Sequence, residues 1–578
     1  MADSTGSNKG LGQQLDQMST ETRLLLAFLL MGAIMFLSPY FFKSQTPAPN
    51  AKKSTQAGQT ADSTVPPTPA EAQPPAVTAE VPSAPTAPVT QAPAEPPLVI
   101  DTDLYKIAFS NRGANVRSWL LKKSLAEGKP LELVNSAAAV EDPYPFSLYM
   151  ADRTALAKKL NAALYQKTVD PDGLGVTYDF SDGHTSVRKT FRFRKDSYLA
   201  QVTSEVSTDG QPVTNMIEWR GGFGDFTLTT AAAKQQTIHF DLTANKLVEQ
   251  TASAAKNGPV TNSGNFSFAG LEDGYFAAIF LPEGNAAMQE VTFSDTTRTA
   301  VIEKPAPFTG AAVSMGAVNH FELFVGPKDF DLLKRINPKL EQVINFGWLS
   351  ILAKPLFLIV NWFNDNVVHN FGWAIVVVTI VINFALFPLK LSNMKSMRKM
   401  QALKPQIDEI NGKYKNIKMT DPKKGEQNQE VMALYKKYGV NPMGGCVPML
   451  IQIPFFFAFY KVFMVSVEMR GANWMWIHDL SVAEPSPIKI LPIVMIASQF
   501  LMQKMTPQAN VDPNQQKLMQ FMPLIFGFMF YQFPSGLVLY YLTSNLVSMG
   551  QQYFFNHTEA AQAAARSVEP AKKKIGRK

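Results

Sequence analysis

Cysteine is nearly absent from this sequence, and the motifs of common hydrolases and nucleotide-binding enzymes are absent altogether. The one cysteine, Cys446, excludes an internal disulfide framework and a zinc site built from several thiolates. There is no H-E-x-x-H, G-x-S-x-G or P-loop motif. The six histidines are scattered, and none lies in an apolar segment beside a carboxylate at helical spacing. We therefore expect no enzyme, no cofactor and no metal site.

Aromatic and β-branched clusters are missing from residues 43–97, where Pro and Ala dominate. Such a segment buries too little apolar surface to offset its ordering entropy, so we predict an extended linker. The preceding residues 22–42 are nearly uncharged and long enough to cross a bilayer as a helix. They show no small-residue cleavage site of a signal peptide. We predict an uncleaved first transmembrane helix, preceded by a cytoplasmic N-terminus at 1–21.

Residues 98–328 have a different texture, with short segments that alternate apolar and polar residues. The stretch TSVRKTFRFRKDSYLAQVTSEV (185–206) is an example, and Asp-Gly and Asn-Gly turns separate such stretches. A period of two with frequent turn residues is typical of antiparallel sheets. We predict one all-β sandwich domain here, and two smaller sandwiches remain an alternative.

Long apolar segments return in the last part of the chain. Residues 341–365 are apolar but contain Lys354 and Pro355 near their centre, which favours an amphipathic helix on the membrane surface over a span. A five-helix core follows at 372–555. Its spans are expected near 372–389, 445–466, 488–503, 519–534 and 536–554.

Basic residues orient these spans. Residues 390–440 contain 12 Lys or Arg against 5 Asp or Glu, and the tail at 556–578 is also basic. The positive-inside rule places both in the cytoplasm. Five spans separate the β domain from the cytoplasmic tail, so the β domain lies on the opposite side of the membrane. The first helix is a sixth span, which places the N-terminus in the cytoplasm as well. The fold class is therefore a polytopic α-helical membrane bundle with an exported all-β sandwich.

The cytoplasmic loop at 392–440 has helical periodicity. Its apolar residues Met394, Met397 and Met400 recur at helical spacing, interleaved with Arg398 and Lys404. We predict a helical hairpin, and a solvated basic loop is the alternative. The charge favours anionic lipid headgroups or ribosomal RNA as partners in either case, and nothing indicates DNA.

Polar residues recur inside the predicted spans. A buried amide without a partner costs roughly 2–7 kcal/mol in an apolar medium, so these residues should face each other or water. Ordinary hydrogen bonding between packed helices explains any one of them, and a shared wet groove explains the set more economically. The set comprises Thr379, Asn383, Gln452, Tyr460, Lys461, Gln499, Gln532, Tyr540, Tyr541, Ser544 and Asn545.

Four blocks of the membrane half resemble the YidC membrane protein insertases. They are VNPMGGCVPMLIQIPFFFAFYKV (440–462), MWIHDLS (475–481), QKMTP (503–507) and FPSGLVLYYLTSNLVSMGQQ (533–552). The Pro-rich linker and the β domain resemble the Gram-negative members, whose periplasmic domain is β-supersandwich-like and largely dispensable for insertion. The resemblance implies an inner-membrane protein that inserts nascent membrane proteins, alone or beside the Sec translocon. It also implies a hydrophilic groove open to the cytoplasm and a cytoplasmic hairpin that receives the substrate, with the ribosome as a further partner.

The sequence departs from that family at one position of the groove. Many relatives carry an arginine at the position that matches Asn383, where its charge is thought to attract acidic segments of the substrate. We expect Lys461 to replace that charge in part, and Gln532 to make the groove more polar. A secondary transporter or channel is the alternative function, although the sequence shows no internal repeat and few carboxylates in its spans.

Overall fold

A computed structural model describes most of the chain from the end of the linker onward. The predicted first span, most of the linker and most of the basic tail lie outside the described residues. The described residues are 88–90, 92–126, 128–138, 143–227, 235–284, 287–297, 305–414, 423–440, 447–505, 521, 523–524, 527–558 and 562–563.

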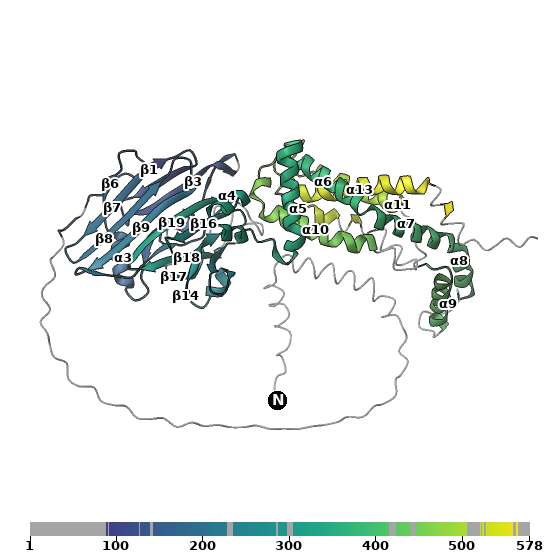
Figure 1. Cartoon of the computed structure of the whole chain (residues 1–578), viewed down its shortest axis with the longest axis horizontal. Helices are drawn as coiled ribbons and strands as arrows, with labels where there is room; N and C mark the ends of the chain where they lie inside the picture. The colour runs from purple at the N-terminus through teal and green to yellow at the C-terminus, as the bar shows by residue number, and fades with distance from the viewer. Residues whose placement is uncertain are drawn as a thin grey trace, which may run out of the picture. The chain divides into compact units, whose positions relative to one another are not determined.

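The first half of the described chain is an antiparallel β domain (Figure 1). Its strands are β1 (Leu98–Asp101), β2 (Tyr105–Ser110), β3 (Asn115–Ala126), β4 (Lys129–Glu132), β5 (Ser147–Tyr149), β6 (Gln166–Val169), β7 (Gly175–Ser181), β8 (Thr185–Phe193), β9 (Leu199–Thr208), β10 (Gln211–Pro212), β11 (Asn215–Trp219), β12 (Gln236–Asp241), β13 (Lys246–Gln250), β14 (Val260–Gly264), β15 (Phe266–Glu272), β16 (Phe276–Pro282), β17 (Met288–Thr297), β18 (Ala306–Gly316) and β19 (Val318–Pro327). The short helices α3 (Thr154–Ala162) and η3 (Ala252–Ala255) interrupt them.

These strands form three sheets. A ten-stranded sheet has the order β13-β12-β15-β16-β19-β9-β8-β7-β6, with β10 beside β9. A five-stranded sheet has the order β14-β17-β18-β11-β5, and a four-stranded sheet follows the chain from β1 to β4. The alternating stretch at 185–206 forms the hairpin of β8 and β9, in which Val187 pairs with Val206 and Phe191 with Val202. The inward residues of this hairpin are buried and mostly apolar, as the period-two pattern predicts, but Lys189 and Ser204 are polar residues buried on the same face.

One hydrophobic core joins the three sheets. Trp119 and Trp219 lie at its centre with their ring centroids 6.2 Å apart, and Phe146 packs against both. Both tryptophans are at most 2% exposed, so they are core residues and not a ligand platform. The continuity of this core favours a single domain over two separate sandwiches.

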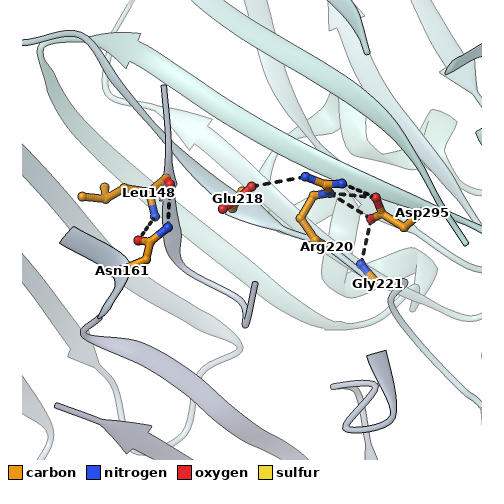
Figure 2. A network of polar contacts seen from close by, with 6 residues as sticks. All are labelled: Leu148, Asn161, Glu218, Arg220, Gly221 and Asp295. Atoms are coloured by element: carbon orange, nitrogen blue, oxygen red, sulfur yellow. Dashed lines mark hydrogen bonds and ion pairs between the residues drawn. The ribbon is translucent and has the colours of Figure 1, made fainter. Parts of the chain in front are cut away.

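Buried charges link the strands of the five-stranded sheet. Figure 2 shows Arg220, which follows β11, donating from Nε to both carboxylate oxygens of Asp295 on β17, at 2.8 and 3.0 Å. The backbone N–H of Gly221 donates to the same carboxylate at 2.8 Å, and Glu218 lies 3.7 Å from the guanidinium. Removing one partner of a buried pair leaves an uncompensated charge, so this network fixes the pairing geometry.

Helices make up the rest of the described chain (Figure 1). They are α4 (Phe330–Ile336), η4 (Pro338–Val343), η5 (Gly347–Leu349), α5 (Ser350–Phe363), the π-helical turn η6 (Asn364–Val368), α6 (Phe371–Ala385), α7 (Phe387–Ala402), α8 (Lys404–Lys413), α9 (Lys423–Lys437), α10 (Val447–Val465), η8 (Val467–Met469), α11 (Ile490–Met505) and α13 (Ser535–Asn556). An all-β domain followed by a helical part is the fold class that the sequence predicts, and it is confirmed.

The helices α8 and α9 pair through polar side chains. Gln427 donates to Asn411 at 2.6 Å, and the Tyr414 hydroxyl donates to Glu430 at 3.0 Å. Residues Ile407–Leu434 belong to a different compact unit from Thr86–Gln406 and Tyr435–Lys578. The helices α8 and α9 therefore contact each other within 392–440, and their connection lies outside the described residues.

Among the described helices, none alone has both the length and the apolar character needed to cross a bilayer. One bent pair, Gly347–Val368 and Phe371–Ala385, meets the requirement by length and composition, with 114° between its two parts. Ile451–Val465 and Ile490–Met505 are shorter apolar helices. The predicted span near 519–534 lies only partly within the described residues.

Candidate functional site

Asn383 is the centre of a polar network inside the helical part. It lies on α6 one turn after Thr379, and both side chains are buried. Its amide nitrogen donates to the Thr379 carbonyl at 2.8 Å. Its amide oxygen accepts from Lys390 Nζ at 2.6 Å and from Ser544 Oγ at 3.3 Å. A single amide thus connects α6, the start of α7 and α13.

The helix α13 supplies the other wall of the network. Tyr540, Ser544, Ser548 and Gln551 recur at spacings of four, four and three residues, which places them on one helix face. Gln452 of α10 donates to the Tyr540 hydroxyl at 2.8 Å and to Ser544 Oγ at 3.2 Å. Polar side chains from four helices therefore converge along this face of α13.

Lys390 brings a positive charge to this network. Its ammonium donates to Asn383 Oδ1 and to Ser548 Oγ, the latter at 2.9 Å, and its side chain is half-buried. Both acceptors are neutral. Within the described part of the chain, no carboxylate pairs with this ammonium. The network therefore carries one cation without an internal counter-charge.

A second polar contact joins α11 to α13. Asn545 donates to Ser498 Oγ at 3.1 Å, and the Ser498 hydroxyl donates to the Met495 carbonyl at 2.6 Å. Next to it, the buried amide oxygen of Gln499 accepts no hydrogen bond from a described residue, and neither does that of Gln551. A buried acceptor in this state is a natural contact for water or for a substrate amide.

Aromatic rings pack beside the network, where α10 ends and α13 begins. The Phe459 ring stacks on Tyr540 with centroids 4.1 Å apart. One turn earlier on α13, Gly536 meets Phe463 so closely that a Cβ would lie 2.3 Å from the ring. Aromatic side chains are therefore closely packed at this end of the helical part.

The other predicted groove residues lie apart from the network. Tyr541 packs on Phe530 at 4.9 Å between ring centroids, and Tyr460 packs on Phe533 at 5.7 Å. Lys461 lies near Gly347 of η5, so it stands with the segment before α5 and not with Asn383. Gln532 is exposed in the turn before α13. The structure thus assigns the cation near Asn383 to Lys390, where the sequence analysis expected Lys461.

The predicted hairpin residues divide between two surroundings. Met394 is buried against Phe555 of α13, and Met400 is also buried. Met397 and Arg398 are partly exposed on α7, where Arg398 donates to Gln401 at 2.9 Å, and Lys404 is exposed at the start of α8. The first turns of the predicted hairpin therefore pack on the helical part through their methionines.

Three residues of the network escaped the sequence analysis: Lys390, Ser548 and Gln551. Ser548 follows Ser544 by one more turn of the same helix, so continuing the helical series would have found it. Lys390 was counted only as a topology charge, although it follows Asn383 by seven residues. Within the described residues, no group of acidic, His or Cys side chains could hold a metal ion.

Comparisons with known proteins identify the family of this chain. The model of the family "60Kd inner membrane protein" matches residues 362–562, and that of the "YidC periplasmic domain" matches residues 97–359. The membrane protein insertase YidC of Syntrophus aciditrophicus is 34% identical over 553 residues, covering 93% of this chain and 99% of that protein. Its counterpart from Citrifermentans bemidjiense is 34% identical over 562 residues, covering 93% and 100%.

This chain belongs to the YidC membrane protein insertase family. The solved structure of an active YidC insertase covers 81% of this chain and 95% of its own, with 20% identity and a TM-score of 0.36. By its family models and sequence relatives, the chain is a membrane protein insertase of the inner membrane and not an enzyme, and its β domain is the periplasmic domain. Its substrates are nascent membrane proteins.

Proposed function

We propose that this insertase moves nascent transmembrane segments and short polar tails into the membrane through a hydrophilic groove built around Asn383. The observation that carries the proposal is the convergence of Asn383, Lys390, Gln452 and the polar face of α13. A polar tail must otherwise cross hydrocarbon, where each unpaired amide costs roughly 2–7 kcal/mol. Amides and hydroxyls partway across offer replacement hydrogen bonds and shorten that crossing.

The position of Lys390 adds a charge preference to this groove. Its ammonium has two neutral acceptors and no carboxylate partner among the described residues. An acidic side chain on an entering tail would complete a charge-assisted hydrogen bond there. Lys390 thereby takes the part that an arginine at the Asn383 position plays in relatives.

We assign the membrane spans to α6, α10, α11, the segment near 519–534 and α13, with both termini in the cytoplasm. The basic residues of α7, α8 and α9 then face the cytoplasm by the positive-inside rule. The packing of Phe459 on Tyr540 closes the periplasmic end of the groove. Substrate tails therefore enter from the cytoplasmic end, beside Lys390 and Gln551.

The helix α5 lies along the periplasmic membrane surface in this proposal. Leu356 and Phe357 on one face are buried, whereas Ile351 and Trp362 on the other are 87% and 56% exposed. A short helix that is apolar on both faces fits a position between the bundle and the lipid. The 114° bend between this segment and α6 supports the same placement.

The partners of the cytoplasmic side follow from charge. We propose that the hairpin of α8 and α9 and the basic tail contact the ribosome and anionic lipid headgroups. The Sec translocon is a further partner for substrates with large exported parts.

Substitution of Asn383 tests the groove. Asn383→Leu leaves Lys390 and Ser544 without their shared acceptor, and such a loss costs about 1–3 kcal/mol. We expect insertion of a single-span substrate into proteoliposomes to slow between about fivefold and a hundredfold. Protease protection of the translocated tail measures the rate.

The matched control replaces an amide outside the network. Gln532→Leu removes the same kind of group from an exposed turn, so we expect a much smaller effect than that of Asn383→Leu. Circular dichroism and thermal unfolding establish that both variants are folded. Equal insertion by the parent and a folded Asn383→Leu variant would remove the groove proposal.

A further inference from the structure

The segment that follows α10 is embedded in the periplasmic domain. Met464 and Val467 pack against the hydrophobic core of the β domain. The Tyr275 hydroxyl, from the turn between β15 and β16, donates to the Phe463 carbonyl at 3.3 Å. The β domain thus holds the end of α10 by apolar contacts and by a hydrogen bond from the Tyr275 side chain to the α10 backbone.

A buried ion pair reinforces this contact. Arg470 pairs with Asp225, and their side chains are 11% and 0% exposed. The guanidinium also lies 5.5 Å from the ring centroid of Tyr275 and donates to the Leu125 carbonyl at 3.3 Å. A pair buried to this degree is strongly destabilised when one partner is removed, because the remaining charge stays out of water.

The turn that contains Asp225 holds its carboxylate in place. Gly224 has a φ of +103°, and a Cβ on it would lie 2.0 Å from the Asp273 carboxylate. Asp273 in turn accepts from the Asp225 backbone N–H at 2.8 Å. Thr227 donates from its N–H and its hydroxyl to the other Asp225 oxygen, at 2.9 and 2.6 Å. Asp225 is therefore fixed before Arg470 reaches it.

Glu468 makes a third connection. One carboxylate oxygen accepts from the Ser466 hydroxyl at 2.7 Å, and the other accepts from the backbone N–H of Phe330 at 3.3 Å. Phe330 begins α4, which joins the last strand of the β domain to the segment leading to α5. The segment Val467–Arg470 therefore touches the β domain on one side and its exit on the other.

We propose that Arg470 is a positioning residue whose ion pair with Asp225 locks the periplasmic end of α10 to the β domain, so that the two move as one body. The lock acts on the groove through α10. Gln452 lies on this helix, about 20 Å from its end at Val465 at a rise of 1.5 Å per residue. The periplasmic domain is then a rigid support for one wall of the groove and not a tethered appendage.

Distance measurements on the full-length protein test the lock. In a Cys446→Ser background, spin labels at Val318→Cys on β19 and Ile488→Cys before α11 report the position of the β domain relative to the helices in nanodiscs. Both sites are exposed, at 53% and 68%. We expect a narrow distance distribution that broadens in Arg470→Gln and narrows again in Arg470→Lys.

Two matched variants accompany this measurement. Arg192→Gln breaks an exposed ion pair of the β domain with Asp172 and should leave the distribution unchanged. Asp225→Asn keeps the shape of the partner side chain but removes its charge, and it should broaden the distribution as Arg470→Gln does. A distribution that stays narrow in a folded Arg470→Gln or a folded Asp225→Asn overturns the lock.

The effect of the lock on the groove rests on the proposed function, and the rate of substrate insertion measures it. We expect insertion by Arg470→Gln to slow at least about threefold, within the usual range of coupling between sites. Broadening without slower insertion would overturn the positioning role while leaving the lock intact. Asn383→Leu should slow insertion while the spin-label distance distribution stays narrow. The two measurements therefore distinguish a failure of the groove proposal from a failure of the lock.

Discussion

The charge of Lys390 should decide which substrates the groove accepts most rapidly. Lys390→Gln removes the ammonium that donates to Asn383 and Ser548 and keeps a polar side chain with an N–H donor. Two unit charges 4 Å apart attract by about 1 kcal/mol in water and about 4 kcal/mol near a protein surface. Because Lys390 is half-buried, its attraction for a substrate carboxylate lies between these limits. Insertion of an acidic tail should therefore slow at least about fivefold.

A pair of substrates makes the assay specific. One carries Asp and Glu in its short translocated tail, and the other carries Asn and Gln at the same positions. Insertion into proteoliposomes is followed by protease protection at low and high salt. We expect Lys390→Gln to slow insertion of the acidic substrate and to change the insertion rate of the neutral substrate less than about twofold. The salt dependence of the insertion rate of the acidic substrate should also decrease.

Two control variants separate charge from packing. Lys390→Arg keeps the charge and should keep the preference for acidic tails. Lys461→Gln removes the cation near Gly347 and should leave that preference in place. If Lys390→Gln slowed both substrates equally, Lys390 would be a structural residue and the electrostatic argument would be refuted.

Two further predictions concern stability. Burial raises the pKa of Glu468 to about 7, with the nearby Asp329 carboxylate adding to the shift. The protonated form therefore stabilises the fold fully below about pH 4.5, its ordinary pKa, and this contribution is lost as the pH rises through 7. The thermal midpoint of the full-length protein should fall over that interval, and Glu468→Gln should remove that part of the slope. Gly536→Ala should lower the midpoint because its Cβ would lie 2.3 Å from Phe463, whereas Gly550→Ala on the same helix meets nothing within 4 Å and should not. Equal midpoints for the two alanine variants would contradict the close packing.

The β domain shows what local patterns can predict. The alternation at 185–206 is a property of the chain itself, and β8 and β9 follow it residue by residue. The strand order of the ten-stranded sheet does not follow from a local pattern. In this sheet β19 pairs with β9, although more than a hundred residues of chain separate the two strands. No local period encodes that pairing, which depends on which apolar faces fit together.

The helical site shows a similar division. Helical spacing alone is enough to place Thr379 and Asn383 on one helix face, and likewise Tyr540 and Ser544, and all four side chains are buried in the structure. Spacing gives no information on the angle between helices. Gln532 therefore looked equivalent to Gln452 in the sequence, although only Gln452 meets α13 through Tyr540 and Ser544.

Lys390 was missed for a reason that bears on how the groove works. A lysine at the end of an apolar segment is ordinarily a topology signal whose ammonium extends into water. Here Leu386 separates α6 from α7, and the long side chain of Lys390 reaches back to Asn383 on the preceding helix. An arginine at position 383 would hold its charge on α6 itself, whereas the lysine delivers its charge from the flexible end of a four-carbon stem.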